Sequence, residues 1–268
     1  MYESFGFETL TAPQAAVWFG VILGLLFGVI AEITRFCLRR AVAGNGTDRR
    51  QAAGVWAIAL AGAIGGTQIA IAGGYLDVSD HRFLSADLPY LAIALGGLLF
   101  GAGMILTRGC VSRLSVLAGS GNLRAVFMIL VFAVTAHATL KGILAPVRTA
   151  IGSVTAPLGE LVSLAALPGG AAVWTAVLVT SLVAFAYRSG APVLHIGLAM
   201  ILGLLVPAGW VGTGFVLFDD FDPVALETLS FTAPVSETLF WTVASSSIRQ
   251  PSGSACSVAL LLGPPCPL

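Results

Sequence analysis

The chain has 268 residues, of which 57% are hydrophobic and only 10% charged, and its mean hydropathy is +0.95. A soluble domain carries about 25% charged residues, so this sequence has too few polar side chains to cover a water-exposed surface. Its 13 basic and 13 acidic residues cancel, and no stretch resembles a nucleotide-binding loop or a nucleic-acid-binding patch. The composition therefore excludes a soluble protein and indicates an integral membrane protein with no nucleic-acid partner.

Long uncharged runs predict six membrane-spanning helices. In chain order they cover residues 11–31, 51–76, 88–107, 125–147, 161–187 and 189–218. A seventh apolar run begins at Leu239 and stops at Ile248, which is too short to cross the bilayer. The N-terminus has acidic residues and no basic n-region, so we expect no cleavable signal peptide. The predicted fold class is all-α, a polytopic integral membrane protein.

The basic residues favour one orientation of these spans. With the N-terminus outside, ten Lys and Arg residues fall on inside segments and three fall outside. Positive charge is concentrated on the cytoplasmic side of membrane proteins. We therefore predict a multi-pass protein of the bacterial plasma (inner) membrane, with its N-terminus outside.

Two stretches of the chain repeat each other. Residues 24–40 and 97–113 align without gaps and share nine of seventeen residues, four of which are polar or sulfur-bearing. The shared polar pattern is Thr-Arg-x-Cys-x-x-Arg. Many transporters are built from internal repeats, with the substrate site where the repeats meet. The repeat predicts a site that includes Cys37 and Cys110.

The two cysteines have a simpler explanation as well. A free cysteine is often buried as a small hydrophobic residue, without any chemical role. A disulfide between Cys37 and Cys110 is disfavoured on the reducing cytoplasmic side. The four cysteines and their neighbours also lack the paired spacing of a zinc site, and we expect no metal and no cofactor. The repeated arginines favour the functional interpretation, because positive neighbours stabilise a thiolate and attract anions.

Candidate binding residues therefore extend beyond the thiols. Arg35 and Arg108 precede the cysteines by two residues, and Arg113 follows Cys110 by three. The same arginines also fit cytoplasmic anchors that reach the membrane interface. Gly109 is expected to break the helix so that a new helix begins beside Cys110, whereas Phe36 makes such a break less expected in the first copy.

One acidic residue lies within the first copy. Glu32 lies three residues before Arg35, a spacing at which the two pair on one helix face. We expect this pair to balance charge.

The chain resembles the YeeE/YedE family of sulfur-compound (thiosulfate) transporters. The motifs that carry the resemblance are TRFCLRRA at 34–41, GAGMILTRGCVSRLSVLAGSGNLRAVF at 101–127 and FDPVALETLSFTAPVSETL at 221–239. The resemblance runs over about residues 14–248. It implies broken helices around a narrow path lined by essential cysteines, with Cys37 and Cys110 matching the first two. It also implies that thiosulfate passes between the thiols without a stable covalent adduct.

The C-terminus departs from the family pattern. The family usually continues with further spans that carry a third cysteine, and Cys256 is a poor match to it. We therefore expect residues 1–248 to form one membrane domain and 249–268 to be an atypical Pro-rich tail on a C-terminally truncated or altered family member.

These observations predict a transport protein rather than an enzyme. Its substrate is expected to be thiosulfate or a similar small sulfur anion, and its surroundings the lipid bilayer. Two alternatives stay open. One is a membrane relay that passes sulfur or selenium from a cysteine persulfide to a cytoplasmic sulfur-carrier protein. The other is a non-functional truncated family member.

Overall fold

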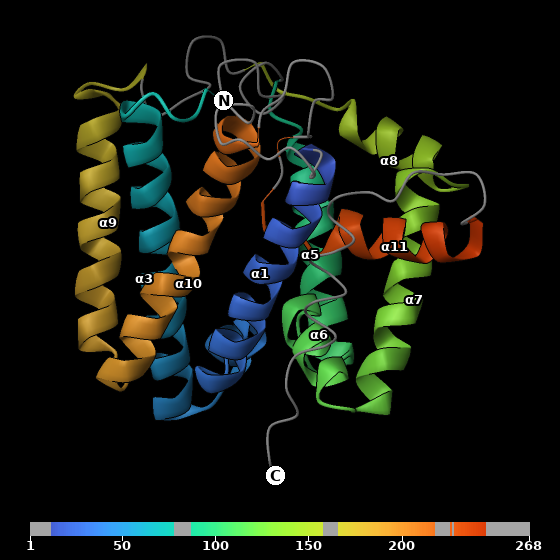
Figure 1. Cartoon of the computed structure of the whole chain (residues 1–268), viewed down its shortest axis with the longest axis horizontal. Coiled ribbons are helices and arrows are strands. Elements are labelled where there is room, and N and C mark those ends of the chain that lie inside the picture. Colours follow the sequence, from blue (N-terminus) through green and yellow to red (C-terminus); the bar gives the residue numbers. More distant parts are fainter. Residues whose placement is uncertain (1–11, 78–86, 158–165, 218–225, 227, 245–268) are drawn as a thin grey trace.

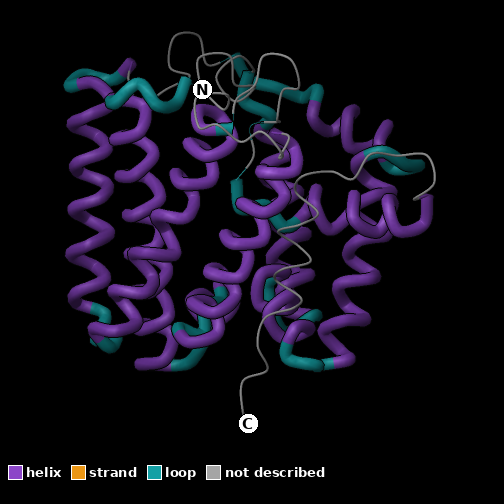
Figure 2. Tube along the Cα trace, viewed as in Figure 1, coloured by secondary structure: helices purple, strands orange, loops and turns teal. Residues whose placement is uncertain are grey.

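A computed structural model of the chain describes residues 12–77, 87–157, 166–217, 226 and 228–244. Six helical segments within these ranges are long and apolar enough to span a membrane, as predicted. Their main helices are α1 (Ala12–Ile33), α3 (Gly46–Ala72), α5 (Tyr90–Leu106), α7 (Leu123–Leu140), α9 (Gly170–Arg188) and α10 (Val193–Val211). The last continues as the π-helical turn η3 (Gly212–Val216). No strand occurs in the described part (Figure 2).

The spans form two groups that meet at α1. Helices α3, α9 and α10 pack together, and α1 lies against α10. On the other side, α7 packs against the short helix α6 (Val111–Gly119), and α6 also touches α1 (Figure 1). The junction between the groups thus includes the end of the second repeat copy.

Small residues allow α3 and α10 to approach closely. A Cβ atom at Gly203 would lie 2.0 Å from the carbonyl oxygen of Ala59, and one at Gly66 would lie 2.6 Å from the ring of Pro207. Such contacts leave no room for a side chain. Close backbone approach through small residues is a main source of helix association in membranes, where the hydrophobic effect is weak.

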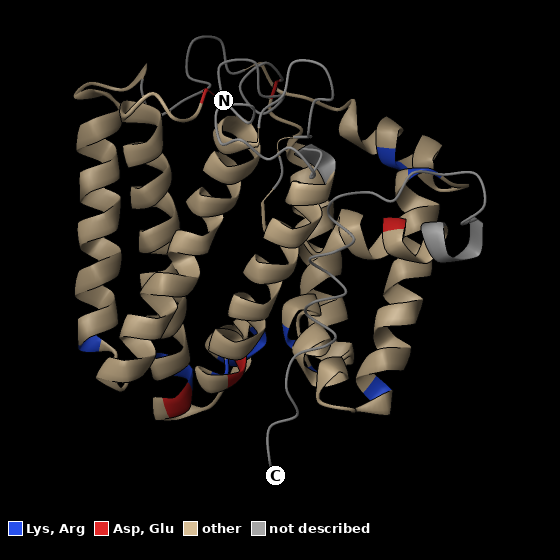
Figure 3. Ribbon diagram, viewed as in Figure 1, with Lys and Arg blue, Asp and Glu red and all other residues tan. Residues whose placement is uncertain are grey.

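The charged residues concentrate at one end of the bundle, which we call the basic end (Figure 3). Arg188 ends α9, Arg124 lies in the first turn of α7, and Arg49 and Arg50 lie near the start of α3. The breaks in both repeat copies, at the ends of α1 and α5, also lie toward this end (Figure 1). This distribution matches the charge asymmetry that the sequence shows.

Several helix bounds differ from the prediction. The second span begins at Gly46 rather than 51 and ends at Ala72 rather than 76, and the fifth begins at Gly170 rather than 161. The fourth span ends at Leu140, and a separate short helix, α8 (Ala145–Gly152), follows, so the expected continuation to residue 147 is wrong. Pro146 lies in the first turn of α8, where the missing N–H of proline costs least.

The seventh apolar run also lies in a helix that begins earlier than expected. It belongs to α11 (Thr232–Ala244), which begins before Leu239 and lies across α7 (Figure 1). A buried hydroxyl helps to hold it there, because Oγ of Ser236 lies 3.1 Å from Nδ1 of His137 on α7. Phe240 stacks on the same imidazole ring, with 4.7 Å between centroids. The predicted boundary at residue 248 and the tail 249–268 lie outside the described residues.

The same repeat residue lies in two environments. Phe27 in α1 is 3% exposed and packs edge-on against Phe36, whereas Phe100, its counterpart in α5, is 50% exposed. Identical sequence thus contributes to the core in one copy and to the periphery in the other.

We expect Phe27→Ala to lower the free energy of unfolding by about 3 kcal/mol, because it leaves a cavity in the core. Phe100→Ala should cost less than about 1 kcal/mol, because little packs on that ring. Unfolding of both variants in mixed micelles measures the difference. Equal losses would contradict the asymmetric packing of the two copies.

Candidate functional site

Both repeat copies break their helix at the same place. Helix α1 ends at Ile33 and α5 ends at Leu106, each just before the Thr-Arg pair. Arg35 and Arg108 then adopt left-handed backbone conformations, with φ of 49° and 60°. They are the only non-glycine residues with positive φ in the described part of the chain. The repeat therefore encodes a backbone shape as well as side chains.

This result corrects the expected origin of the break. Gly109 does not have a positive φ, and Phe36 in its place does not prevent a break in the first copy. A Cβ atom at Gly109 would make only ordinary contact with Leu114, at 3.5 Å. At the same position, Phe36 is buried and stacks on Trp56, with 4.6 Å between ring centroids. The arginine, rather than the glycine, carries the unusual backbone conformation.

Hydrogen bonds close the turn in the first copy. The N–H of Arg35 donates to the carbonyl of Glu32 (3.1 Å), and the N–H of Phe36 donates to the carbonyl of Ala31 (2.9 Å). This pair of bonds is the Schellman motif, which satisfies the last carbonyls of a helix and usually has glycine at the left-handed position. The backbone of the broken helix thus stays paired.

The second copy reproduces the main contacts of the first. The N–H of Arg108 donates to the carbonyl of Ile105 (3.2 Å), as its counterpart does. The hydroxyls of Thr34 and Thr107 each donate to the carbonyl four residues earlier, at 2.7 and 2.8 Å. The Thr107 hydroxyl also donates to the carbonyl of Gly109 (2.8 Å). The repeated threonine therefore has a structural role at the end of each helix.

After each turn, a cysteine lies at the start of a short helix. Cys37 is the N-cap of α2 (Leu38–Ala43), and Cys110 is the N-cap of α6. Both thiols are free and buried, and they form one cluster with Met104. They are close enough to share a hydrogen bond, and each also faces a backbone N–H of the other copy. The two copies thus meet at their cysteines, which we call the thiol pair.

Two members of this site were not found from the sequence. Ser112 lies with its hydroxyl 3.1 Å from the sulfur of Cys110, and Met104 packs beside both thiols. Neither is repeated, because Arg39 and Ala31 stand at the matching positions of the first copy. Proximity to Cys110 was the only signal for Ser112, and nothing in the sequence indicated Met104.

The predicted arginines have different surroundings. The side chains of Arg35 and Arg108 are exposed, whereas Arg113 forms an ion pair with Glu32, with 2.5 Å between Nη1 and Oε2. The expected pairing of Glu32 with Arg35 on one helix face is therefore wrong. A carboxylate of the first copy instead binds an arginine of the second. Arg40, the counterpart of Arg113, pairs instead with Asp48 in the first turn of α3, and its Nε donates to both carboxylate oxygens at 2.9 Å.

The groups around the thiol pair are donors and soft acceptors. Within the described ranges, no three His, Cys, Asp or Glu side chains gather as metal ligands. Cys110 lies where the backbone N–H groups of the first turn of α6 carry partial positive charge. A thiol adds a weak S–H donor and a soft sulfur acceptor.

These features define a class, a helical multi-pass membrane protein in which a duplicated broken helix brings two thiols together. A family model described as sulphur transport matches residues 33–264. The match covers most of the chain, which belongs to this sulphur transport (YeeE/YedE) family. Among individually curated proteins, none matches the chain.

The residue range of the family match differs from the range over which the sequence motifs resemble the family. It starts at residue 33 rather than 14 and continues past 248 to 264. Membership together with six candidate spans indicates a membrane protein that transports sulfur compounds, and points to a transporter rather than an enzyme.

Glycine at the left-handed positions should stabilise the fold. We expect Arg108→Gly and Arg35→Gly each to raise the free energy of unfolding by up to about 1 kcal/mol, because glycine adopts positive φ without a steric cost. Arg124→Gly, in the first turn of α7, is the control and should lower the free energy of unfolding by up to about 1 kcal/mol. If all three variants lose stability equally, the left-handed turns are wrong.

The ion pair between the copies should be energetically coupled. A double-mutant cycle with Glu32→Gln and Arg113→Gln is expected to give a coupling free energy of about 1–2 kcal/mol. Both side chains are mostly buried, because only 29% of Glu32 and 20% of Arg113 are exposed. The more exposed pair of Lys141 and Glu237 is the control, with an expected coupling below about 0.5 kcal/mol. Unfolding measurements on the two cycles test the difference, and no coupling at the first pair would contradict the contact.

Proposed function

We propose that the chain takes up thiosulfate or a similar small sulfur anion, and that Cys110 and Cys37 contact it. The observation that carries the proposal is that both repeat copies end at one buried thiol pair. A lone buried cysteine is well explained by packing. Two cysteines in duplicated turns that converge from separate helices are less well explained in that way, and family membership favours a sulfur substrate.

The chemistry of the thiol pair supports a sulfur anion in particular. Thiols donate weakly through S–H and accept through a polarisable sulfur, so they suit a substrate with terminal sulfur. Charge balance for a dianion is available from the start of α6 and from the exposed arginines Arg35 and Arg108. Gly109 adds a buried backbone segment beside Cys110. Arg113 acts differently in this proposal, because its ion pair with Glu32 holds the two copies together.

The closeness of the thiols argues against the sulfur relay. A persulfide on Cys110 would have the Cys37 thiol beside its inner sulfur. Attack by that thiol forms a Cys37–Cys110 disulfide and releases the outer sulfur as hydrogen sulfide, as in ordinary thiol exchange. A stable persulfide carrier for a sulfur-carrier protein needs an isolated thiol instead. We therefore favour transport through transient contacts.

The proposed orientation of the chain in the membrane follows from charge. The basic end of the bundle is assigned to the cytoplasm by the positive-inside rule, which leaves the N-terminus outside in a bacterial plasma membrane. The thiol pair then lies toward the cytoplasmic end of the path.

Removing either thiol should strongly reduce uptake. We expect Cys110→Ala and Cys37→Ala each to reduce thiosulfate uptake at least about tenfold, because each removes a contact to a partly desolvated anion. The assay measures radiolabelled thiosulfate entering cells that lack other sulfate and thiosulfate importers. Cys256→Ala is the matched control and should transport as the parent does.

Three outcomes would overturn the proposal. Unchanged uptake by Cys110→Ala rejects the thiol contact, and no uptake by the parent chain rejects an independently active transporter. A mass increase of one sulfur on Cys110 after exposure to thiosulfate favours the relay instead.

A further inference from the structure

A cavity lies at the basic end, apart from the thiol pair. Its volume is about 520 Å³, and residues of α2, α3 and α9 line it. The lining residues are Ala41, Gly46, Arg49, Arg50, Ala53 and Phe185. None of them belongs to the thiol cluster, so the cavity needs an explanation of its own.

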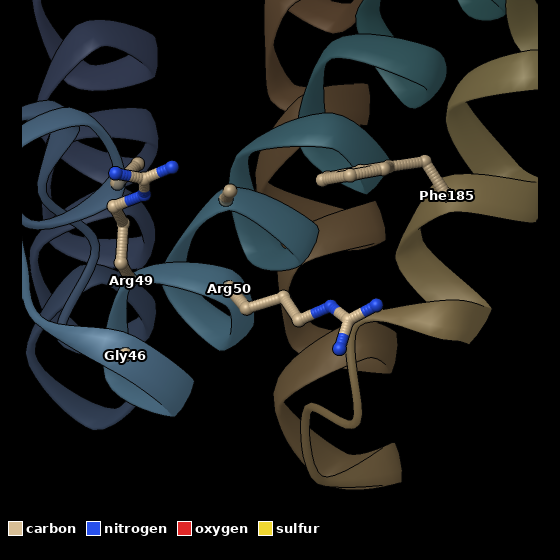
Figure 4. Close-up of a pocket in the computed structure, with 6 residues that line it drawn as sticks. Gly46, Arg49, Arg50 and Phe185 are labelled. Carbon is tan, nitrogen blue, oxygen red and sulfur yellow. The ribbon is translucent and has the colours of Figure 1, made fainter.

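The cavity has a cationic wall and an apolar wall. Arg49 and Arg50 are both exposed, and their side chains extend to opposite sides of the first turns of α3 (Figure 4). The ring of Phe185 points from α9 toward α3 in the same view. The nearest acidic residue in sequence, Asp48, does not line the cavity and is paired with Arg40. Both arginines line the cavity, and no carboxylate is found among the described residues that line it.

The depth of the cavity matches the membrane interface. Arg49 and Arg50 lie near the start of α3, and Phe185 lies in the last turn of α9. Tyr187 in that turn is 77% exposed, and Arg188 ends the helix. Aromatic and basic residues together at the end of a span are typical of the lipid headgroup region. The cavity is therefore positioned beside lipid, rather than inside the bundle.

We propose that this cavity binds the phosphate group of an anionic phospholipid. The phosphate binds to Arg50, which extends on the same side of α3 as Phe185, because guanidinium groups bind phosphate oxygens strongly. Arg49 adds positive charge to the lining of the cavity. The glycerol and the first carbons of the acyl chains lie along Phe185 and Ala53. Basic pockets between membrane helices at the cytoplasmic side are suited to such headgroups. The site is independent of sulfur transport and does not use the thiol pair.

Lipid titration of the purified full chain tests this proposal. The protein is delipidated in neutral detergent and titrated with phosphatidylglycerol or phosphatidylcholine, and native mass spectrometry counts the bound lipid. We expect phosphatidylglycerol to bind more tightly, and the double variant Arg49→Gln/Arg50→Gln to bind it about tenfold more weakly. Arg124→Gln removes an exposed arginine at the same end and should bind as the parent does. The variant Arg49→Lys/Arg50→Lys keeps the charge and should retain most of the binding.

Two further experiments distinguish a lipid ligand from free phosphate. Phe185→Ala should weaken the binding of phosphatidylglycerol several-fold, and millimolar inorganic phosphate should not displace the lipid. Full displacement by phosphate, together with no effect of Phe185→Ala, would identify a free-phosphate site and overturn the lipid assignment. Equal binding of both lipids, or equal loss in Arg124→Gln and the double variant, would also overturn it. The melting temperature of each variant shows that it is folded.

Discussion

The structure of the site depends on one constraint, the need to break a helix in a membrane without leaving its backbone unpaired. An unsatisfied carbonyl or N–H costs several kcal/mol in hydrocarbon, so a broken helix must close its own end. Here the Schellman bonds at Arg35 and the threonine hydroxyls do so within a few residues. The chain can then turn and begin a new helix at a cysteine. The position of the thiols is a direct consequence of this local closure.

The two copies of the duplicated element have the same backbone shape but pack against different surroundings. Both copies have the left-handed arginine, the threonine bond and the N-cap cysteine. Phe27 lies in the core, whereas Phe100 is half exposed. The turn is therefore specified by the few residues that form it, and the apolar part of the repeat adapts to whatever surrounds each helix. The fold can use one motif at its centre and again at its edge.

Sequence reasoning found the spans and the repeat because hydropathy and charge act along the chain. It predicted a break beside Cys110, but attributed it to Gly109, because glycine is the usual residue at a helix end. Nothing in the sequence marks an arginine that will adopt a positive φ, because arginine has a high helix propensity and is expected to continue the helix. Likewise, Glu32 has a suitable partner three residues away in Arg35, and only the fold shows that Arg113 is closer. Contacts between distant segments, such as Met104 with the thiols, have no local pattern at all.

The ion pair between Glu32 and Arg113 also explains how two copies in different surroundings keep their cysteines in register. The thiols belong to separate short helices, and neither helix is long enough to be stable alone. A partly buried carboxylate of α1 that binds the first turns of α6 fixes the distance between the two turns. Because this ion pair joins the two copies, it makes the position of the second turn depend on the first. A duplicated one-thiol element, joined to its copy by such a cross-contact, thus forms a two-thiol site.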